Sequence, residues 1–438
     1  MADEAPLYNL KAVALQTGLK PDTLRAWERR YGLPCPTRSS GRQRLYSQHD
    51  IDVLRWLETR QHEGLTIARA VALFRQVEAE GRDPLQVVAA RALPGNPGVE
   101  LPAAGTTLGT MREEWLAACL TYDRRKADQA AAQAFALFRP EVVCLEMLQW
   151  AMREVGELWR QGKASVQQEH FVSELATGRL KALLVACPPA NRADPILTAC
   201  PPGEYHTFGL LLLTYLLRHL GWSVVYLGAD VPVEQLDVAV ATIRPGLIIM
   251  AAQRLPSAAA LLEGAERIRD LAPLAFAGGV FNRLPQLRAR VPGFFLGESI
   301  DLAPTTAEVL LSGPRVAPTP EPIPEEARAA LVRFRERRFS VEAEVGGSSE
   351  SCGLARSQVA SACAELALQI EAALSLGDIW LVECGDLKEN LGLQGIPAEK
   401  FAGLAIAYMN AAERHLDGPG GLLLDWLRKT QVQPGCHP

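Results

Sequence analysis

A carboxylate, an imidazole and a glycine stand close together in the stretch CPPGEYHTFG, at the spacing Glu204-x-His206-x-x-Gly209. A neutral imidazole can bind a metal through one ring nitrogen while a carboxylate accepts the hydrogen of the other, which fixes the tautomer. A glycine three residues later leaves space for a bulky ligand. The pattern therefore indicates a metal or cofactor ligand, and the alternative is a His that caps a helix or lies in solvent.

A second Glu-His pair, Glu169 and His170, lies in the amphipathic stretch QQEHFVSELATGRL, and Trp159 precedes Glu169 by ten residues. On its own, a Trp is more often a core residue than part of a binding site. The combination of this Trp, this pair and the downstream Glu-x-His-x-x-Gly pattern is much rarer by chance than any one of them. We therefore predict that the two groups serve one site.

The elements that must position these residues follow from the hydrophobic pattern of residues 192–312. Four short apolar runs, PILTAC, WSVVYLG, GLIIMAA and PLAFAGG, alternate with helical patterns, which predicts a doubly wound, Rossmann-like parallel sheet. Ligands of such sheets bind at the carboxyl ends of the strands. The stretch with His206 follows the first predicted strand, and Gly278 and Gly279 follow the fourth, so both are expected at this edge.

Helical patterns flank the predicted sheet on both sides. Residues 111–188 contain four of them with short connections, which predicts a helical bundle. Residues 325–438 predict a further all-helical domain, in which His415 falls at a helix end and is expected in solvent. For this domain, a role in oligomerisation or partner binding and a second chromophore such as a bilin both stay open.

Residues 1–90 predict a small DNA-binding domain. The stretch LYNLKAVALQTGLKPDTLRAWERRYGLP contains two short helical patterns around a glycine turn, and PTRSSGRQRLYS forms a basic, turn-rich hairpin, as in helix-turn-helix proteins. Residues 20–46 hold seven basic and two acidic residues, a local charge of +5 in a chain of net charge −5. The expected DNA contacts are Lys20, Arg25, Arg29, Arg42, Arg44 and Tyr46. The alternative is a helical domain with a solvated basic face.

The remaining composition limits the class of protein. A chain of 438 residues with 48% hydrophobic and 22% charged residues is expected to fold into several domains, and residues 91–110, rich in Gly and Pro, predict a linker. No apolar run reaches the roughly 18–20 residues that span a bilayer, and the acidic N-terminus lacks the apolar segment of a secretory signal. Nine Cys without a CxxC pair are typical of a reducing compartment. We therefore expect a cytoplasmic, multidomain α and α/β protein without a membrane segment.

The basic segment LRAWERRYGLPCPTRSSGRQRLYS closely resembles the DNA-binding domain of MerR-type transcription regulators, and the resemblance covers about residues 7 to 80. It implies a winged helix-turn-helix that reads inverted repeats in double-stranded operator DNA as a dimer. The partner of such a protein is therefore DNA, and its effector is expected outside this domain.

Residues 111–312 resemble the cobalamin-binding module shared by B12-dependent methionine synthase and the B12-based photoreceptor regulators. The family's Asp-x-His-x-x-Gly motif appears here with Glu204 in place of Asp. The resemblance implies that His206 Nε2 is the lower ligand of cobalt and that Glu204 holds the other ring nitrogen. It also implies that the displaced nucleotide tail of the cofactor passes Gly278 and Gly279. The bundle would cover the upper face of the corrin with Trp159, Glu169 and His170.

The two resemblances together imply a regulator that is not an enzyme and that uses adenosylcobalamin as a light sensor. Its oligomeric state, dimer or tetramer, is then expected to depend on cofactor and light. One alternative is a sensor of cobalamin level without photochemistry. A second is a corrinoid methyl-transfer subunit, which the sequence disfavours because the chain after residue 312 is too short for a substrate barrel.

Two positions depart from the photoreceptor pattern. Ala251 and Ala252 stand where the family often has Ser-x-Leu, which removes a polar contact expected for the nucleotide tail. Arg160 follows Trp159, where light-sensing relatives have a His that binds cobalt from above after photolysis. A guanidinium is protonated at working pH and has no lone pair for a metal. We therefore expect water or hydroxide, and not a second imidazole, above cobalt in the illuminated protein.

Overall fold

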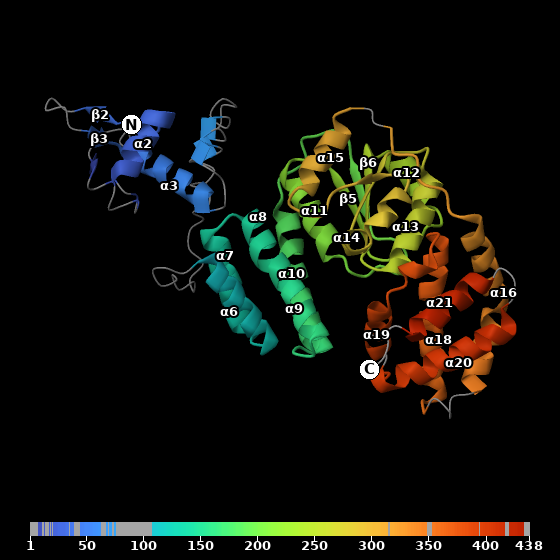
Figure 1. The fold of residues 1–438 in the computed structure, drawn as a ribbon. Helices are drawn as coiled ribbons and strands as arrows, with labels where there is room; N and C mark the ends of the chain where they lie inside the picture. Colours follow the sequence, from blue (N-terminus) through green and yellow to red (C-terminus); the bar gives the residue numbers. More distant parts are fainter. Residues whose placement is uncertain are drawn as a thin grey trace. The chain divides into compact units, whose positions relative to one another are not determined.

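The computed structural model describes residues 8–10, 13, 17, 19, 21–34, 36–38, 44–62, 67–68, 70–71, 74–75, 107–313, 316–347, 353–393, 395–416 and 420–432. The chain divides into two compact units, Met1–Glu100 and Leu101–Pro438, which are described separately (Figure 1). Most of the predicted linker lies outside the described residues. Its last residues, however, already belong to a helix, because Leu108 begins α6.

The N-terminal unit combines short strands with helices. Its elements are β1 (Tyr8–Asn9), α2 (Pro21–Tyr31), β2 (Thr37–Arg38), β3 (Arg44–Tyr46) and α3 (Gln48–His62). The strands are antiparallel in the order β1-β3-β2, which confirms the predicted hairpin. Pro21 opens α2, where its missing N–H costs nothing. Ser47 and Asp50 cap α3 reciprocally, since Ser47 N–H donates to Asp50 Oδ2 and Asp50 N–H donates to Ser47 Oγ.

The second unit begins with the predicted helical bundle. Its elements are α6 (Leu108–Leu120), α7 (Arg124–Leu137), α8 (Pro140–Val143), the π-helical segment η1 (Cys144–Gln149), α9 (Trp150–Arg160) and α10 (Val166–Ala186). Side-chain oxygens of Thr107, Asp123 and Ser165 cap α6, α7 and α10. A π-helical turn interrupts the third helix of the bundle between α8 and α9, which the sequence pattern does not show.

A five-stranded parallel sheet follows, in agreement with the predicted fold class. Its strands are β4 (Ile196–Ala199), β5 (Val224–Gly228), β6 (Leu247–Ala251), β7 (Leu274–Ala277) and β8 (Phe294–Phe295), in the order β5-β4-β6-β7-β8. The first four are the predicted strands, and β8 was not predicted because two residues make no recognisable run. The strand order reverses between β4 and β6, so loops that follow these two strands diverge there.

Helices cover both faces of this sheet (Figure 1). They are α11 (Phe208–His219), α12 (Leu236–Ile243), α13 (Leu255–Ile268), α14 (Gly279–Arg283), the 3-10 segment η2 (Pro285–Ala289) and α15 (Ala303–Leu311). Alternate residues of β6 enter different cores: Ile249 packs in the cluster with α11 and α15, whereas Met250 packs in the cluster with α12 and α13. Helix α11 is buried on two sides, because Leu213 faces the sheet cluster and Leu212 belongs to the bundle cluster.

The predicted C-terminal helices are present. They are α16 (Glu325–Gly347), α18 (Arg356–Ser375), α19 (Cys384–Leu393), α20 (Phe401–His415) and α21 (Gly421–Val432), with 3-10 turns η3 (Ile379–Leu381) and η4 (Ala398–Lys400). His415 does not lie free in solvent as predicted, because its Nε2 is 2.8 Å from Glu344 Oε2. Within the part of the chain that the structure describes, no helix has the length and apolar character needed to cross a membrane.

Candidate functional site

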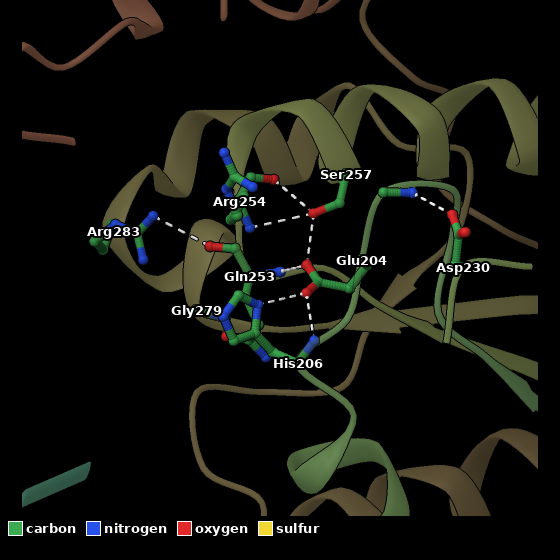
Figure 2. Close-up of polar contacts among 9 residues, drawn as sticks. Glu204, His206, Asp230, Gln253, Arg254, Ser257, Gly279 and Arg283 are labelled. Atoms are coloured by element: carbon green, nitrogen blue, oxygen red, sulfur yellow. Dashed lines mark hydrogen bonds and ion pairs between the residues drawn. The ribbon is translucent and has the colours of Figure 1, made fainter. Parts of the chain in front are cut away.

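The Glu204–His206 pair has the geometry of a supported metal ligand. His206 Nδ1 lies 2.7 Å from Glu204 Oε1, and the backbone N–H of His206 donates to the same oxygen at 2.9 Å (Figure 2). The carboxylate of Glu204 is fully buried, whereas the His206 side chain is 65% exposed. Because Nδ1 is engaged with the carboxylate, the exposed Nε2 is the ring nitrogen that can bind a metal.

Two groups that follow β6 hold the second carboxylate oxygen of Glu204. The N–H of Gln253 donates to Glu204 Oε2 at 2.6 Å, and the hydroxyl of Ser257 donates to it at 2.7 Å. Burial alone raises the pKa of Glu204, but the hydrogen bonds from His206, Ser257 and Gln253 outweigh burial and lower its pKa to about 2. Glu204 is therefore ionised at any working pH and acts only as an acceptor.

The sheet topology explains why these groups meet. Glu204 and His206 lie in the loop after β4, and Gln253 and Ser257 lie after β6, so the two loops flank the point where the strand order reverses. Ligands of open α/β sheets bind at this position. Asp230, after β5, holds the first loop from its other side, since Oδ1 accepts the N–H of Gly203 at 2.8 Å and Oδ2 accepts the hydroxyl of Tyr205 at 2.9 Å.

The bundle packs through α10 against α11, the helix that begins two residues after His206. The hydrogen bond from Glu204 is the largest cause that raises the pKa of His206, and the negative charge of Glu169 on α10 adds a smaller contribution in the same direction. The shared site of Glu169 and His206 stays a prediction. His170, beside Glu169, is 75% exposed, and its Nδ1 is 3.6 Å from Glu169 Oε2.

Trp159 and Arg160 lie at the end of α9. Trp159 is partly buried and packs against the core of the bundle, so part of its surface serves packing. Arg160 is exposed and pairs with Glu157 one turn earlier, at 2.5 Å between Nη2 and Oε2. The guanidinium that follows the Trp is thus engaged in a surface ion pair.

The glycines of the predicted site differ in what surrounds them. A Cβ at Gly209 would meet no atom within 4 Å, so this position is open beside His206. A Cβ at Gly278 would lie 1.9 Å from the carbonyl oxygen of Ala252, and one at Gly279 would lie 2.7 Å from Oε1 of Gln253. Gly278 also has φ +126, which L side chains rarely adopt. The close contact with Ala252 therefore explains the glycine at position 278, with or without a nucleotide tail beside it.

The sequence pattern missed Ser257, Gln253 and Asp230. Ser257 is 1% exposed in the first turn of α13, and it lies 53 residues from the carboxylate that it contacts. Gln253 acts through its backbone N–H, which leaves no signature in residue type. Its side-chain oxygen accepts the N–H of Gly279 at 2.8 Å, beside the position where the family often has Ser-x-Leu. The proximity of these loops could be predicted only from the strand order.

The predicted DNA contacts divide into four groups. Arg25 and Arg29 are exposed on α2, as a groove-facing role requires. Arg44 is partly exposed, and its Nε donates to Glu28 Oε2 at 2.8 Å, so part of its charge is already paired. Lys20 and Arg42 lie outside the described residues. Tyr46 corrects the prediction, because its side chain is fully buried in the core with Leu24 and Leu54 and does not face DNA.

The fold and the site together define a class of protein: a DNA-binding regulator with a winged helix-turn-helix and a parallel-sheet domain that presents a carboxylate-supported His. Residues 8–77 match the MerR HTH family regulatory protein model, and residues 111–184 and 195–304 match two B12 binding domain models. These three matches coincide with the winged helix-turn-helix, the bundle and the sheet.

Two curated relatives match this chain over most of their own length. The HTH-type transcriptional repressor CarH of Myxococcus xanthus is 33% identical over 266 residues, which are 61% of this chain and 85% of CarH. The HTH-type transcriptional repressor CarA of the same organism is 31% identical over 64% of this chain and 88% of CarA. The chain belongs to the family of MerR-type transcription regulators with B12-binding domains. A solved structure, the monomethylamine corrinoid protein of Methanosarcina barkeri, has 19% identity and a TM-score of 0.41 over 46% of this chain and 100% of its own.

Family membership confirms four predictions. The protein is a transcription regulator and not an enzyme, it binds DNA, and it binds cobalamin. The predicted combination of a helix-turn-helix with a Rossmann-like cobalamin domain is also confirmed. The roles of single residues remain predictions.

Replacing Arg25 with Ala is expected to reduce discrimination between operator and random DNA by about 1–3 kcal/mol, because side chains of the recognition helix read base edges. Replacing Arg29 with Ala is expected to have the same effect if it also reaches a base. A fluorescence anisotropy titration with specific and random duplexes at several salt concentrations measures this. Arg124→Ala, which removes an exposed Arg from α7, is the matched control and should change neither affinity. Unchanged discrimination in both α2 variants would place the reading surface elsewhere.

Proposed function

We propose that this protein is a light-responsive transcription regulator that uses adenosylcobalamin as its chromophore and His206 Nε2 as the lower ligand of cobalt. The observation that carries the proposal is the Glu204–His206 pair at the point where the strand order reverses, with Nδ1 engaged and Nε2 exposed. With cobalamin bound, Nε2 of His206 would bind cobalt in place of the cofactor's own base.

The residues around His206 fit this role. Glu204 is ionised and keeps the hydrogen of the imidazole on Nδ1, which leaves the lone pair of Nε2 for the metal. The open space beside Gly209 supports close approach of a large planar ring. We assign Trp159, Glu169 and His170 to the upper side, because they lie on α9 and α10 of the bundle, which packs against α11 beside the His206 loop. Gly278 and Gly279 are assigned to the path of the nucleotide tail.

The regulatory part of the proposal concerns the bundle. When bound, adenosylcobalamin supplies a cobalt–carbon bond that light breaks, with loss of the adenosyl group. Trp159, Glu169 and His170 would contact the upper group and hold the bundle in one packing arrangement, and without that contact another arrangement would be more stable. The C-terminal end of α9 and the first turns of α10 would respond first, because they carry the upper-side residues. We propose that this change alters assembly between a dimer and a tetramer on operator DNA.

Protein purified in the dark with adenosylcobalamin is expected to elute as a larger assembly than the same sample after green light. Size-exclusion chromatography with light scattering, combined with absorption spectra before and after illumination, measures both changes. Operator binding in a gel-shift assay should change in parallel. An assembly that depends on cobalamin but not on light would favour the cobalamin-level sensor instead. The proposed switch would be overturned if neither assembly nor DNA binding changed with cofactor or with light.

The same samples test the chemistry at Arg160. Illuminated wild-type protein is expected to show the spectrum of cobalt with water or hydroxide above it, because the Arg160 guanidinium has no lone pair to donate. Arg160→His should convert this to the spectrum of cobalt with two imidazoles, and His170→Ala should leave the wild-type spectrum unchanged. A two-imidazole spectrum in wild type that persists in His170→Ala would contradict the assignment.

A further inference from the structure

The loop that supports Glu204 is also tied to the C-terminal helices. Gln253, whose N–H holds the carboxylate, is followed by Arg254, whose side chain is directed away from Glu204 (Figure 2). The guanidinium of Arg254 reaches α18, where Nη2 lies 3.1 Å from Glu365 Oε1. Two adjacent residues therefore connect the support of His206 on one side with a different helical layer on the other.

The backbone of Arg254 takes part in the same support. Its N–H donates to Ser257 Oγ at 3.2 Å, and this hydroxyl donates its own hydrogen to Glu204 at 2.7 Å. The position of the Arg254 peptide thus sets the position of the hydroxyl, and the peptide before it supplies the Gln253 N–H. A shift of Arg254 would disturb two of the hydrogen bonds that Glu204 accepts.

Glu365 is built into its site from several elements. It is 8% exposed, and its Oε1 also accepts the side-chain amides of Gln369 at 2.9 Å and Asn390 at 2.8 Å. The donors come from Arg254, the residue before α13, from α18 itself and from α19. A buried carboxylate held by three donors has little freedom to move, so it fixes the guanidinium that it pairs with.

Apolar packing joins the same two layers. Leu261, Leu262 and Ala265 of α13 share one buried cluster with Ala362, Leu366 and other residues of α18. The ion pair between Arg254 and Glu365 lies at the N-terminal end of this contact, where α13 begins. The cluster holds the helices together, and the ion pair sets the position of the residue that begins the support of Glu204.

We infer that Glu365 is a positioning residue for the cobalt ligand, acting through Arg254 and the peptides that hold Glu204, so that the C-terminal helices are part of the support of the cobalamin site. This inference rests on the proposed role of His206. It gives the C-terminal helices a function that neither their composition nor the B12-binding modules assign to them.

Glu365→Gln in the full chain is expected to weaken cobalamin binding by about tenfold and to increase the fraction bound without imidazole coordination, because outer partners orient a metal-binding His. The matched control is Glu371→Gln on the same helix, whose carboxylate pairs with Arg335 and Arg338 of α16 and not with α13. Arg254→Met breaks the same ion pair from the other side while keeping the aliphatic stem, and it should reproduce the effect of Glu365→Gln.

A second measurement needs no cofactor. Hydrogen–deuterium exchange of the N–H groups of Gln253 and Arg254 is expected to be faster in Glu365→Gln and Arg254→Met than in wild type and in Glu371→Gln. Two variants with the exchange rates and the imidazole-ligated spectrum of wild type would overturn the inference. If wild type itself bound cobalamin without imidazole coordination, the proposed role of His206 would fail, and the exchange rates would still decide whether Glu365 positions this loop.

Discussion

Cobalamin bound to His206→Ala is expected to lack imidazole coordination, and the affinity is expected to fall by at least about 100-fold. The reason is that Nε2 of His206 is exposed while Nδ1 is engaged, so the variant removes the ligand and leaves its support in place. Absorption spectra report the coordination, and equilibrium titration reports the affinity.

The matched control is His219→Ala. His219 lies at the other end of α11, and its Nε2 pairs with Glu141 at 3.1 Å. Its removal changes a His of the helix that follows the loop after β4 without touching that loop, so coordination should be unchanged. Tight binding by His206→Ala with the wild-type spectrum would contradict the assigned ligand.

The glycines are expected to separate folding from cofactor binding. Gly278→Ala should lower the free energy of unfolding of the second unit by at least about 3 kcal/mol, because its Cβ would meet the Ala252 carbonyl oxygen at 1.9 Å and its φ is +126. Gly209→Ala should leave the free energy of unfolding unchanged or slightly raise it, since the site is open and Ala favours a helix. Chemical denaturation followed by circular dichroism measures both.

Cobalamin binding is expected to change in Gly209→Ala, the variant whose free energy of unfolding should not fall. Gly209→Ala should weaken binding although the protein is folded, because the added methyl group occupies space beside His206. Full cobalamin affinity in Gly209→Ala would show that the ring does not approach this position. Wild-type stability in Gly278→Ala would show that the strand ends of β6 and β7 move apart more easily than the close contact indicates.

The fold was predictable where the hydrophobic pattern was continuous. The runs that became β4, β5, β6 and β7 are short and apolar, as expected for strands buried in a parallel sheet. Strand β8 has only two residues, so its run carries no periodic signal. The π-helical segment Cys144–Gln149 was also missed, because one widened turn hardly changes the apolar pattern of a buried helix.

The site was predictable only in its local part. Glu204 and His206 are two residues apart, so the sequence shows them together, whereas the contact between Glu204 and Ser257 depends on strand order. In the hairpin, residues that are close in the sequence have different surroundings in the structure. Arg44 and Tyr46 belong to one basic stretch, but only the three-dimensional arrangement shows that Tyr46 lies in the core.

The buried cluster shared by α13 and α18 has a consequence for how the second unit loses its structure. Helix α13 shares one buried apolar cluster with the sheet and with the C-terminal helices, so separating those helices would expose this apolar face to water. Sheet and C-terminal helices are therefore expected to melt as one cooperative body. A ligand that binds the folded form stabilises the entire body by mass action, including helices that it does not touch. In the cell, loss of the cofactor would thus lower the protection of the C-terminal helices against proteases as well as that of the sheet.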